Sequence, residues 1–341
     1  MDIIMQNTFG RNIKITIFGE SHAPEIGVII EGLPSGFAID IEALRAFLKR
    51  RAPGQGKHTT TRKEPDEPEF IEGLKDGKTT DAPLKVIIRN TDIKPSDYEN
   101  IRDIPRPSHA DYTAYVKYGK EHDFSGGGAF SGRMTAPLCI AGGICLQLLA
   151  QKNISISAHI TQIGDITGKS AEPNEKMLVA IEEARQLGDS LGGIIECAIT
   201  GVPAGVGEPM FDGLENHIAS VIFGIPAAKG IEFGNGFAAA GLKGSENNDA
   251  FIIKDNKIQT RTNNHGGILG GISSGMPIVF RVAIKPTPSI SIEQDSISLS
   301  RKEPVKLSIK GRHDPCIIPR AVPCIEAAAA IAIYDIIRDN N

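Results

Sequence analysis

The stretch MTAPLCIAGGICLQLLAQKN, residues 134–153, decides the fold. Apolar residues occupy every face of a helix drawn through it, and such a helix is buried rather than amphipathic. A second stretch of this kind, RHDPCIIPRAVPCIEAAAAIAIYDIIRDNN (312–341), ends the chain with few polar positions. Two helices that are apolar all round predict a helical layer buried between sheets.

The segments around these helices supply the elements for those sheets. Alternating and continuous apolar runs predict strands over 13–19, 27–32, 84–90 and 192–202, and a further strand that ends at Lys285-Pro286. Asp40 is placed to cap a helix over 41–52, in which apolar residues recur at helical spacing. Two more helices are expected over 175–188 and 215–225. Neither a short-period repeat nor a linker divides the chain, so a single domain over 1–341 is expected.

Composition excludes several functional classes. The 341 residues carry a net charge of −4, whereas nucleic-acid binding needs a basic surface. The five cysteines include no C-x-x-C pair, which argues against a zinc site and for a reducing compartment. The N-terminus lacks a signal peptide, and the longest apolar run, from Met134 to Ala150, is shorter than a bilayer span. We therefore expect a cytoplasmic protein with no membrane, nucleic-acid or metal partner.

Four segments combine polar, chemically useful side chains with glycine: GESHAP (19–24), RRAPGQGKHTTTR (50–62), RPSHADYT through GGGAFSGR (106–133) and KGRHDPC (310–316). Arginine forks match carboxylates and phosphates. In an acidic chain, basic residues gathered in glycine-containing loops favour binding of a small polyanion over a set of solvated surface charges. The basic residues are Arg50, Arg51, Lys57, Arg62, Arg106, Arg133 and Arg312.

Two histidines are candidates for proton transfer. His22 and His109 each lie in a turn-rich segment with a hydroxyl and a carboxylate nearby, and histidine is the side chain that serves as acid and base near neutrality. For either residue alone, a structural role is an equal alternative.

Three glycine motifs do not carry their usual meaning. GISSG (271–275) fits the G-x-S-x-G nucleophile pattern, but a strand rather than a helix is expected after it. GGGAFSGR (126–133) lacks the G-K-[ST] ending of a phosphate loop, although its backbone could still face an anion at the start of a helix. GGILGG (266–271) lacks the spacing of a dinucleotide-binding fingerprint.

Taken together, the polar segments resemble the chorismate synthase family. The matching blocks are FGESHAPEIGVIIEGLPSG (18–36), RRAPGQGKHTTTRKEPDEPEFIEGLKDGKTT (50–80), RPSHADYTAYVKYG (106–119), KGSENND (243–249), NNHGGILGGISSGMPI (263–278), AIKPTPSI (283–290) and GRHDPCIIPRAVPCIEA (311–327). The blocks occur in the family's order and cover essentially the whole chain, which makes the resemblance far more specific than any single glycine motif.

The resemblance implies a fold and a reaction. The family has an α+β fold in which a helical layer is sandwiched between two antiparallel β-sheets, and it forms homotetramers. It converts 5-enolpyruvylshikimate 3-phosphate to chorismate by 1,4-anti elimination of phosphate, the last step of the shikimate pathway. The reaction needs reduced FMN although it has no net redox change. Some members also reduce flavin with NADPH; no long insertion stands out here, so a monofunctional enzyme is expected.

The resemblance also implies roles for individual residues. His22 would protonate the leaving phosphate, and His109 would keep the reduced flavin in a usable protonation state near its N1 atom. Asp314 would assist proton removal from the substrate near flavin N5, with Ser21 and Ser131 supporting the proton network. Substrate anions would be bound by Arg51, Lys57, Arg62, Arg106, Arg133 and Arg312. The flavin would contact Ala129, Phe130, Ser131, Pro226, Ala227, Gly270, Lys285, Pro286, Thr287, Pro288, Ser289 and Arg312.

The sequence departs from the family mainly in the glycine-rich loop. Where members have Arg-Ser-Ser-Ala-Arg-Glu-Thr, residues 129–135 are Ala-Phe-Ser-Gly-Arg-Met-Thr. Pro226-Ala227 replaces Asn-Ala, Ala23 replaces Gly, and Lys57 stands where many members have Arg. Two alternatives stay open: a phosphoesterase or phosphotransferase that uses the same arginines, and a non-catalytic flavin- or phosphate-binding relative. The first needs a metal site or an activated nucleophile, and the second would not need His22, His109 and Asp314 together.

Overall fold

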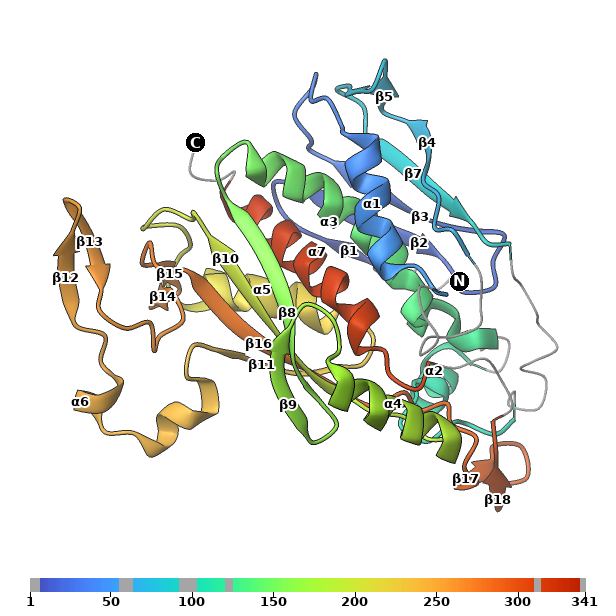
Figure 1. Cartoon of the computed structure of the whole chain (residues 1–341). Helices are drawn as coiled ribbons and strands as arrows, with labels where there is room; N and C mark the ends of the chain where they lie inside the picture. The colour runs from blue at the N-terminus through green and yellow to red at the C-terminus, as the bar shows by residue number, and fades with distance from the viewer. Residues whose placement is uncertain (1–6, 55–63, 92–102, 120–124, 310–313, 338–341) are drawn as a thin grey trace.

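The computed structural model describes residues 7–54, 64–91, 103–119, 125–309 and 314–337, and within them two antiparallel sheets enclose a layer of helices (Figure 1). The predicted α+β architecture, with a helical layer between two antiparallel sheets, is therefore confirmed. The helices run through the middle of the molecule, with the blue N-terminal sheet on one side and the yellow-green and orange sheet on the other.

The first sheet comes from the N-terminal quarter of the chain. Its strand order is β1-β2-β3-β7-β4, and every neighbouring pair is antiparallel. Apolar side chains of its central strands are buried against the helices. The strands are β1 (Thr8–Phe9), β2 (Lys14–Gly19), β3 (Glu25–Glu31), β7 (Leu84–Arg89) and β4 (Glu69–Glu72).

The second sheet has the order β11-β16-β10-β8-β9, again antiparallel throughout. Burial alternates without exception along β16, as expected for a strand with one face on the core. The strands are β11 (Ala228–Phe233), β16 (Ile278–Ile284), β10 (Gly193–Thr200), β8 (Ser155–Ile163) and β9 (Ile166–Ser170).

Four helices form the central layer: α1 (Ile41–Arg51), α3 (Thr135–Ala150), α5 (Leu214–Phe223) and α7 (Ile318–Ile337). Helix α3 packs on the first sheet and α7 on the second, and the two also pack on each other. They approach so closely that a Cβ atom added to Gly142 would lie 2.3 Å from the Cα atom of Ala327. Only glycine fits at this crossing, which explains the glycines inside an otherwise apolar helix.

Helix α1 begins as its sequence predicts. The Asp40 carboxylate accepts a hydrogen bond from the Ala43 backbone N–H at 2.9 Å, the usual arrangement of an N-cap. Leu44 and Leu48 lie on its buried face. The last turn carries Arg50 and Arg51, and the helix ends at Arg51, so it delivers two guanidinium groups to the end of the helical layer.

The remaining elements lie around this frame. They are helices α2 (Asp111–Tyr118), α4 (Glu175–Leu187) and α6 (Gly244–Asn247), and the two-stranded sheets β5–β6 (Leu74–Lys75, Lys78–Thr79), β12–β13 (Phe251–Lys254, Lys257–Thr260), β14–β15 (Ile268–Leu269, Ile272–Ser273) and β17–β18 (Gln294–Ser298, Glu303–Leu307). The β12–β13 hairpin and α6 project from the body of the molecule (Figure 1).

One cluster of buried apolar side chains extends from Ile13 to Ile337 and joins both sheets to the helices. Residues 132–150 are long and apolar enough to cross a membrane, but 83% of that window is buried inside the protein, as in a core helix. At the far end of α7, the buried Asp335 carboxylate accepts hydrogen bonds from the backbone N–H groups of residues 11–13. The C-terminal helix thereby holds the start of the first sheet.

Candidate active site

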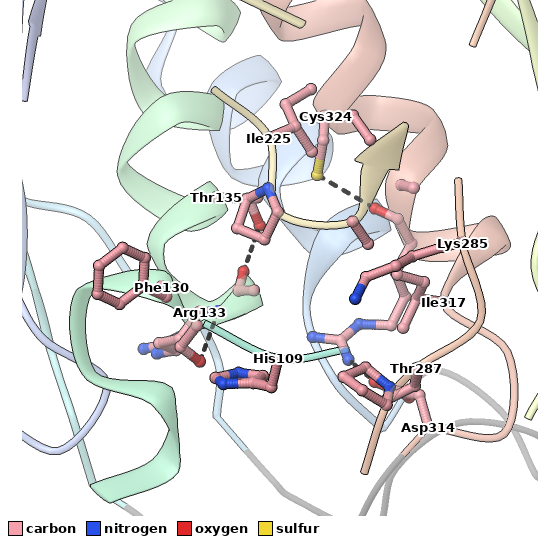
Figure 2. A pocket seen from close by; sticks show the side chains of 18 of the residues that line it. His109, Phe130, Arg133, Thr135, Ile225, Lys285, Thr287, Asp314, Ile317 and Cys324 are labelled. Atoms are coloured by element: carbon pink, nitrogen blue, oxygen red, sulfur yellow. Dashed lines mark hydrogen bonds and ion pairs between the residues drawn. The ribbon is translucent and has the colours of Figure 1, made fainter. Parts of the chain in front are cut away.

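A cavity of about 520 Å³ lies at one end of the helical layer (Figure 2). Its walls come from the end of α1, the loop before α2, the glycine-rich loop before α3, the turn between α5 and β11, the segment after β16 and the start of α7. Two long helices, α3 and α7, direct their N-termini to this region, and a helix N-terminus carries partial positive charge. The frame alone therefore favours a negatively charged ligand.

Most of the residues singled out from the sequence meet in this cavity. They come from separate parts of the chain and line the same walls: Ser21, Arg51, Arg106, His109, Ala129, Phe130, Ser131, Arg133, Pro226, Ala227, Lys285, Thr287, Pro288, Ser289 and Asp314. Six cationic and two acidic side chains line the cavity, so the excess of positive charge matches a polyanion.

Six of the predicted site residues are not found in this lining. Lys57, Arg62 and Arg312 lie outside the described residues. His22 follows Ser21 in the chain and Pro286 lies within the lining segment 285–289, but neither is itself one of the lining residues. Gly270 forms the turn of the β14–β15 hairpin, far from α2 in Figure 1, and nothing lies within 4 Å of a Cβ added to it. The flavin contact that the resemblance implies for Gly270 stays a prediction.

One wall is formed by what we term the Arg51 cluster: Arg51, Glu64, Asp66 and Arg133. All four side chains are at most 3% exposed. Asp66 lies between the two arginines and forms an ion pair with each of them. Arg51 also bonds to the Thr135 hydroxyl at 3.1 Å, and Arg133 has its Nε atom 3.0 Å from Glu64.

The charges of the Arg51 cluster hold one another in place. Burial opposes ionisation of Asp66, but the two guanidinium groups outweigh it and keep the pKa of that carboxyl below its ordinary value. Burial lowers the pKa of Arg133 against the attraction of Asp66. Guanidinium groups remain protonated at any physiological pH. The cluster therefore keeps a fixed charge distribution near neutrality.

Three polar atoms on the cavity walls are buried and have no hydrogen-bond partner among the described residues: Ser21 Oγ, Thr287 Oγ1 and one terminal nitrogen of Arg133. Buried polar groups in native proteins are normally paired, and the exceptions call for an explanation. Two hydroxyls and a guanidinium N–H that converge on one cavity suit an anionic ligand with several oxygen atoms, such as a phosphate ester or a carboxylate.

A second wall carries the His109 cluster: Arg106, His109 and Asp111. Asp111, the first residue of α2, accepts hydrogen bonds from the Arg106 backbone N–H at 2.9 Å and from its guanidinium Nε at 2.7 Å. The second oxygen of the same carboxylate lies 2.6 Å from His109 Nδ1. This contact assigns the Nδ1 proton to the bond with Asp111 and leaves Nε2 as the acceptor of neutral His109.

The electrostatics of the His109 cluster favour the neutral imidazole. Burial lowers the pKa of His109, the hydrogen bond to Asp111 opposes that shift, and the positive charge of Arg106 adds to it. Burial also opposes ionisation of Asp111, but its bonds from Arg106 and His109 hold the pKa of that carboxyl well below its usual range. His109 is thus a neutral base near pH 7, oriented by an ionised aspartate.

The glycine-rich loop fits closely against this histidine. Gly127 has φ +91°, which side chains rarely adopt, and a Cβ added to it would lie 3.2 Å from His109 Nε2. Gly128 accepts a hydrogen bond from the Ser21 backbone N–H at 3.2 Å. Glycine at these positions brings the loop against His109 and joins it to the segment that contains His22.

The start of α7 adds a third ion pair. Arg320 pairs with Asp314, and its Nε atom donates to the Arg51 backbone carbonyl at 3.0 Å. Lys285 on the facing segment donates to the Ser108 carbonyl, and burial together with Lys229 lowers the pKa of that amine. Asp314 is thereby held near the arginines, at the edge of the cavity beside the segment after β16.

Sequence reasoning missed Glu64, Asp66 and Arg320. The two acids lie in a segment without apolar periodicity, and their partners are distant in the chain, so no spacing pattern reveals them. A signal for Arg320 did exist. A helix with so few polar positions retains a charge only where it is paired, and Arg320 is paired with Asp314.

Other sequence candidates have structural surroundings. Arg50 forms an ion pair with Glu326 and does not line the cavity. Ser273, the serine of the G-x-S-x-G match, is buried in β15; its hydroxyl donates to the Pro203 carbonyl at 2.6 Å and accepts from the Val206 N–H at 2.9 Å. Strand β16 follows, so the match is not a nucleophile turn, as predicted.

Fold and cavity together define a class of protein: an α+β protein with a cationic cavity that suits a small polyanion, with buried arginines and a neutral histidine on its walls. A family model described as chorismate synthase matches residues 13–337. The chain belongs to the chorismate synthase family, and it is a lyase of the last step of the shikimate pathway.

Individual relatives agree with this assignment. Chorismate synthase of Korarchaeum cryptofilum is 45% identical, with 96% of each chain covered. Chorismate synthase of Lancefieldella parvula is 44% identical and covers 97% of this chain and 96% of its own. A solved crystal structure of chorismate synthase superimposes with a TM-score of 0.73 at 26% identity, over 97% of this chain and 93% of the other.

Proposed function

We propose that the chain converts 5-enolpyruvylshikimate 3-phosphate to chorismate and phosphate by 1,4-anti elimination, with reduced FMN as cofactor. The observation that carries the proposal is the convergence of separate segments on one cationic cavity that also holds His109 and Asp314. Loss of phosphate builds negative charge on oxygen, and buried guanidinium groups stabilise such charge more strongly than water does.

Substrate binding is assigned to the arginines. Arg51 and Arg133 are held by Asp66, and Arg106 is held by Asp111, so their guanidinium groups keep a fixed orientation on the cavity wall. Lys57, Arg62 and Arg312 complete the proposed set for the phosphate and carboxylates. Positioned donors of this kind supply binding without reorganisation during the reaction.

Proton transfer is assigned to His22, His109 and Asp314. His22 acts as the general acid for the leaving phosphate, a role that typically contributes about 10²–10⁴-fold. His109 holds the protonation state of the cofactor, and its bond to Asp111 supports that role. Asp314 assists removal of the ring proton, while Ser21 and Ser131 carry protons between these groups.

The cofactor supplies the remaining chemistry: when bound, reduced FMN donates electron density transiently to the electron-poor ring. The residues present fit such a group. Thr287 and Ser289 offer hydroxyls, Lys285 offers a cation, and Pro288, Phe130 and Ala227 offer apolar surface on the same cavity. Ala129, Ser131, Pro226, Gly270, Pro286 and Arg312 are the other proposed contacts.

An anaerobic assay tests the proposal. Purified protein is mixed with 5-enolpyruvylshikimate 3-phosphate, FMN and dithionite, and chorismate absorbance is followed, with oxidised FMN as the control. Chorismate that forms only with reduced flavin is the expected result. Flavin binding without chorismate would contradict the proposal and favour the non-catalytic alternative.

Removal of metal ions tests the other alternative. A phosphoesterase or phosphotransferase that depends on a metal would lose activity in EDTA, whereas the proposed elimination keeps its full rate. Release of phosphate without chorismate would favour the hydrolytic alternative directly.

We further propose a homotetramer of single-domain chains in the cytoplasm. The shared core from Ile13 to Ile337 supports one domain over 1–341, and the buried free cysteines suit a reducing compartment. Exposed apolar side chains on the β12–β13 hairpin and on the segment before α6 support self-association. Phe237, Phe251, Ile253 and Ile258 are 69–87% exposed. Sedimentation that shows only monomer at micromolar concentration would refute the tetramer.

A further inference from the structure

Two thiols meet at the cavity wall opposite His109. Cys324 of α7 lines the cavity, and in Figure 2 it lies above Thr135 while His109 lies below. Its sulfur is 3.9 Å from the sulfur of Cys139 on α3. The remaining cysteines of the described chain are also free and buried, but none of them lines the cavity. The proposed elimination uses neither Cys139 nor Cys324.

The helix crossing explains why the sulfurs are so close. Helices α3 and α7 touch at Gly142 and Ala327, where a glycine is required. Each cysteine lies three residues before that crossing, so the pair is one helical turn from the closest approach. A disulfide needs Cα atoms within about 7 Å and sulfurs about 2 Å apart. The close crossing favours the first condition, and the sulfurs, 3.9 Å apart, have about 2 Å left to close by rotation of the two side chains.

The surroundings distinguish Cys324 from the other cysteines. The hydrogen bond from Cys139 lowers the pKa of Cys324, burial opposes the shift, and the positive charge of Arg51 and Arg320 adds to it. Burial raises the pKa of Cys139 well above its ordinary value. The thiolate is the reactive form of cysteine, so attack on an oxidant begins at Cys324 rather than at Cys139.

We propose that Cys324 and Cys139 form an oxidisable dithiol, in which peroxide entering the cavity joins α3 to α7 through a disulfide. In the first step the Cys324 sulfur attacks hydrogen peroxide, the O–O bond breaks, and sulfenic acid and water form. In the second step the Cys139 sulfur displaces the hydroxyl from that sulfenic acid, and a second water leaves. Two thiols and one peroxide thus give one disulfide and two waters.

Disulfide formation changes the cavity wall. The Cys324 sulfur now lies 3.3 Å from the Arg320 carbonyl, and Arg320 holds both Asp314 and the Arg51 carbonyl. A bond to Cys139 draws the sulfur toward α3 and away from that carbonyl. Oxidation therefore changes the cavity wall at Cys324, and it lowers turnover reversibly.

Thiol counting and peptide mapping test the proposal without reference to activity. The full-length protein is treated with hydrogen peroxide, quenched with catalase and denatured, and free thiols are titrated. The count is expected to fall from five to three, and dithiothreitol restores it. A non-reducing digest is expected to show the Cys139 peptide linked to the Cys324 peptide within one chain. An unchanged count, or a bond between other cysteines, overturns the proposal.

Two variants make the assignment specific. In Cys139→Ser the disulfide is lost, and Cys324 stops at the sulfenic acid, which dimedone traps. The matched control is Cys197→Ser, because Cys197 is a buried cysteine of β10 away from the cavity. The four thiols that remain in this variant should still fall to two. Loss of two thiols from Cys139→Ser would contradict the assignment. The peptide map of the unaltered protein tests the proposed disulfide even if a variant fails to fold.

Discussion

The two walls of the cavity both contain buried charges, but they pair those charges in different ways. Each buries arginine beside aspartate, but the Arg51 cluster shares one carboxylate between two guanidinium groups, whereas the His109 cluster shares one between a guanidinium and an imidazole. The Arg51 cluster consists of guanidinium and carboxyl groups only. The His109 cluster contains an imidazole, and its pKa is lowered by burial.

Under the proposed function, the difference separates binding from proton transfer within a single cavity. A fixed-charge wall holds an anion with the same strength across the physiological pH range. A wall that contains a neutral, oriented histidine exchanges a proton without moving its neighbours. Changes to either wall should therefore affect different quantities, and the predictions below run from the largest expected effect to the smallest.

Asp66→Asn should break the fixed-charge wall. It leaves Arg51 and Arg133 buried without their shared counter-ion, and loss of one partner of a buried pair costs about 3–5 kcal/mol. Urea denaturation measures the loss. Arg45→Gln is the matched control, because its pairs with Glu42 and Glu67 are on the surface and should contribute less than about 1 kcal/mol. Equal losses in both variants would refute the contrast.

Asp111→Asn should cost less, about 1.5–3 kcal/mol, the range of hydrogen bonds to charged groups. Arg106 then loses its counter-ion but keeps a contact with the Ser289 hydroxyl at 3.3 Å. His109 loses the acceptor that fixes its tautomer. Thermal unfolding measures the stability, and turnover should fall by a larger factor than substrate affinity, because Arg106 is only one of several cations proposed to bind the substrate. A change in affinity alone would assign this wall to binding instead.

The pH dependence of stability should come from His109 in the mildly acidic range. Its folded-state pKa is lowered, so the unfolded chain binds more protons and the free energy of unfolding falls as the pH drops below about 6.5. Each pKa unit between the folded and the unfolded state contributes about 1.4 kcal/mol to the free energy of unfolding. Asp66 and Asp111, also lowered, act only below about pH 4. Urea unfolding at pH 7.5 and 5.5 should show a smaller difference in His109→Gln; an unchanged difference would contradict the shift.

Ser21→Ala should have the smallest effect on stability, within about 0.5 kcal/mol. Its buried hydroxyl has no partner among the described residues, so no internal hydrogen bond is lost. Turnover should nevertheless fall. Thr135→Val is the matched comparison, because that hydroxyl bonds to Gly132 and Arg51 and its loss costs about 1 kcal/mol. A large stability loss in Ser21→Ala would mean that the hydroxyl serves the fold.

Local rules predicted the frame of this protein well. Asp40 marks the start of α1, and the all-round apolar stretches mark α3 and α7, because capping and burial depend on neighbours along one helix. The resemblance named half of the residues that line the cavity. What it did not provide is how they are held: Asp66 joins arginines 15 and 67 positions away. Ion pairs of such separation follow from the assembled fold and leave no pattern in a sequence.

Asp335 has a consequence for synthesis of the chain. Its carboxylate holds residues 11–13, and α7 completes the core between the sheets. A growing chain acquires these contacts only after α7 has left the ribosome, although domains otherwise begin to fold from the N-terminus. Until then one face of the apolar helix α3 and the inner face of the second sheet stay uncovered, so folding of the nascent chain waits for α7.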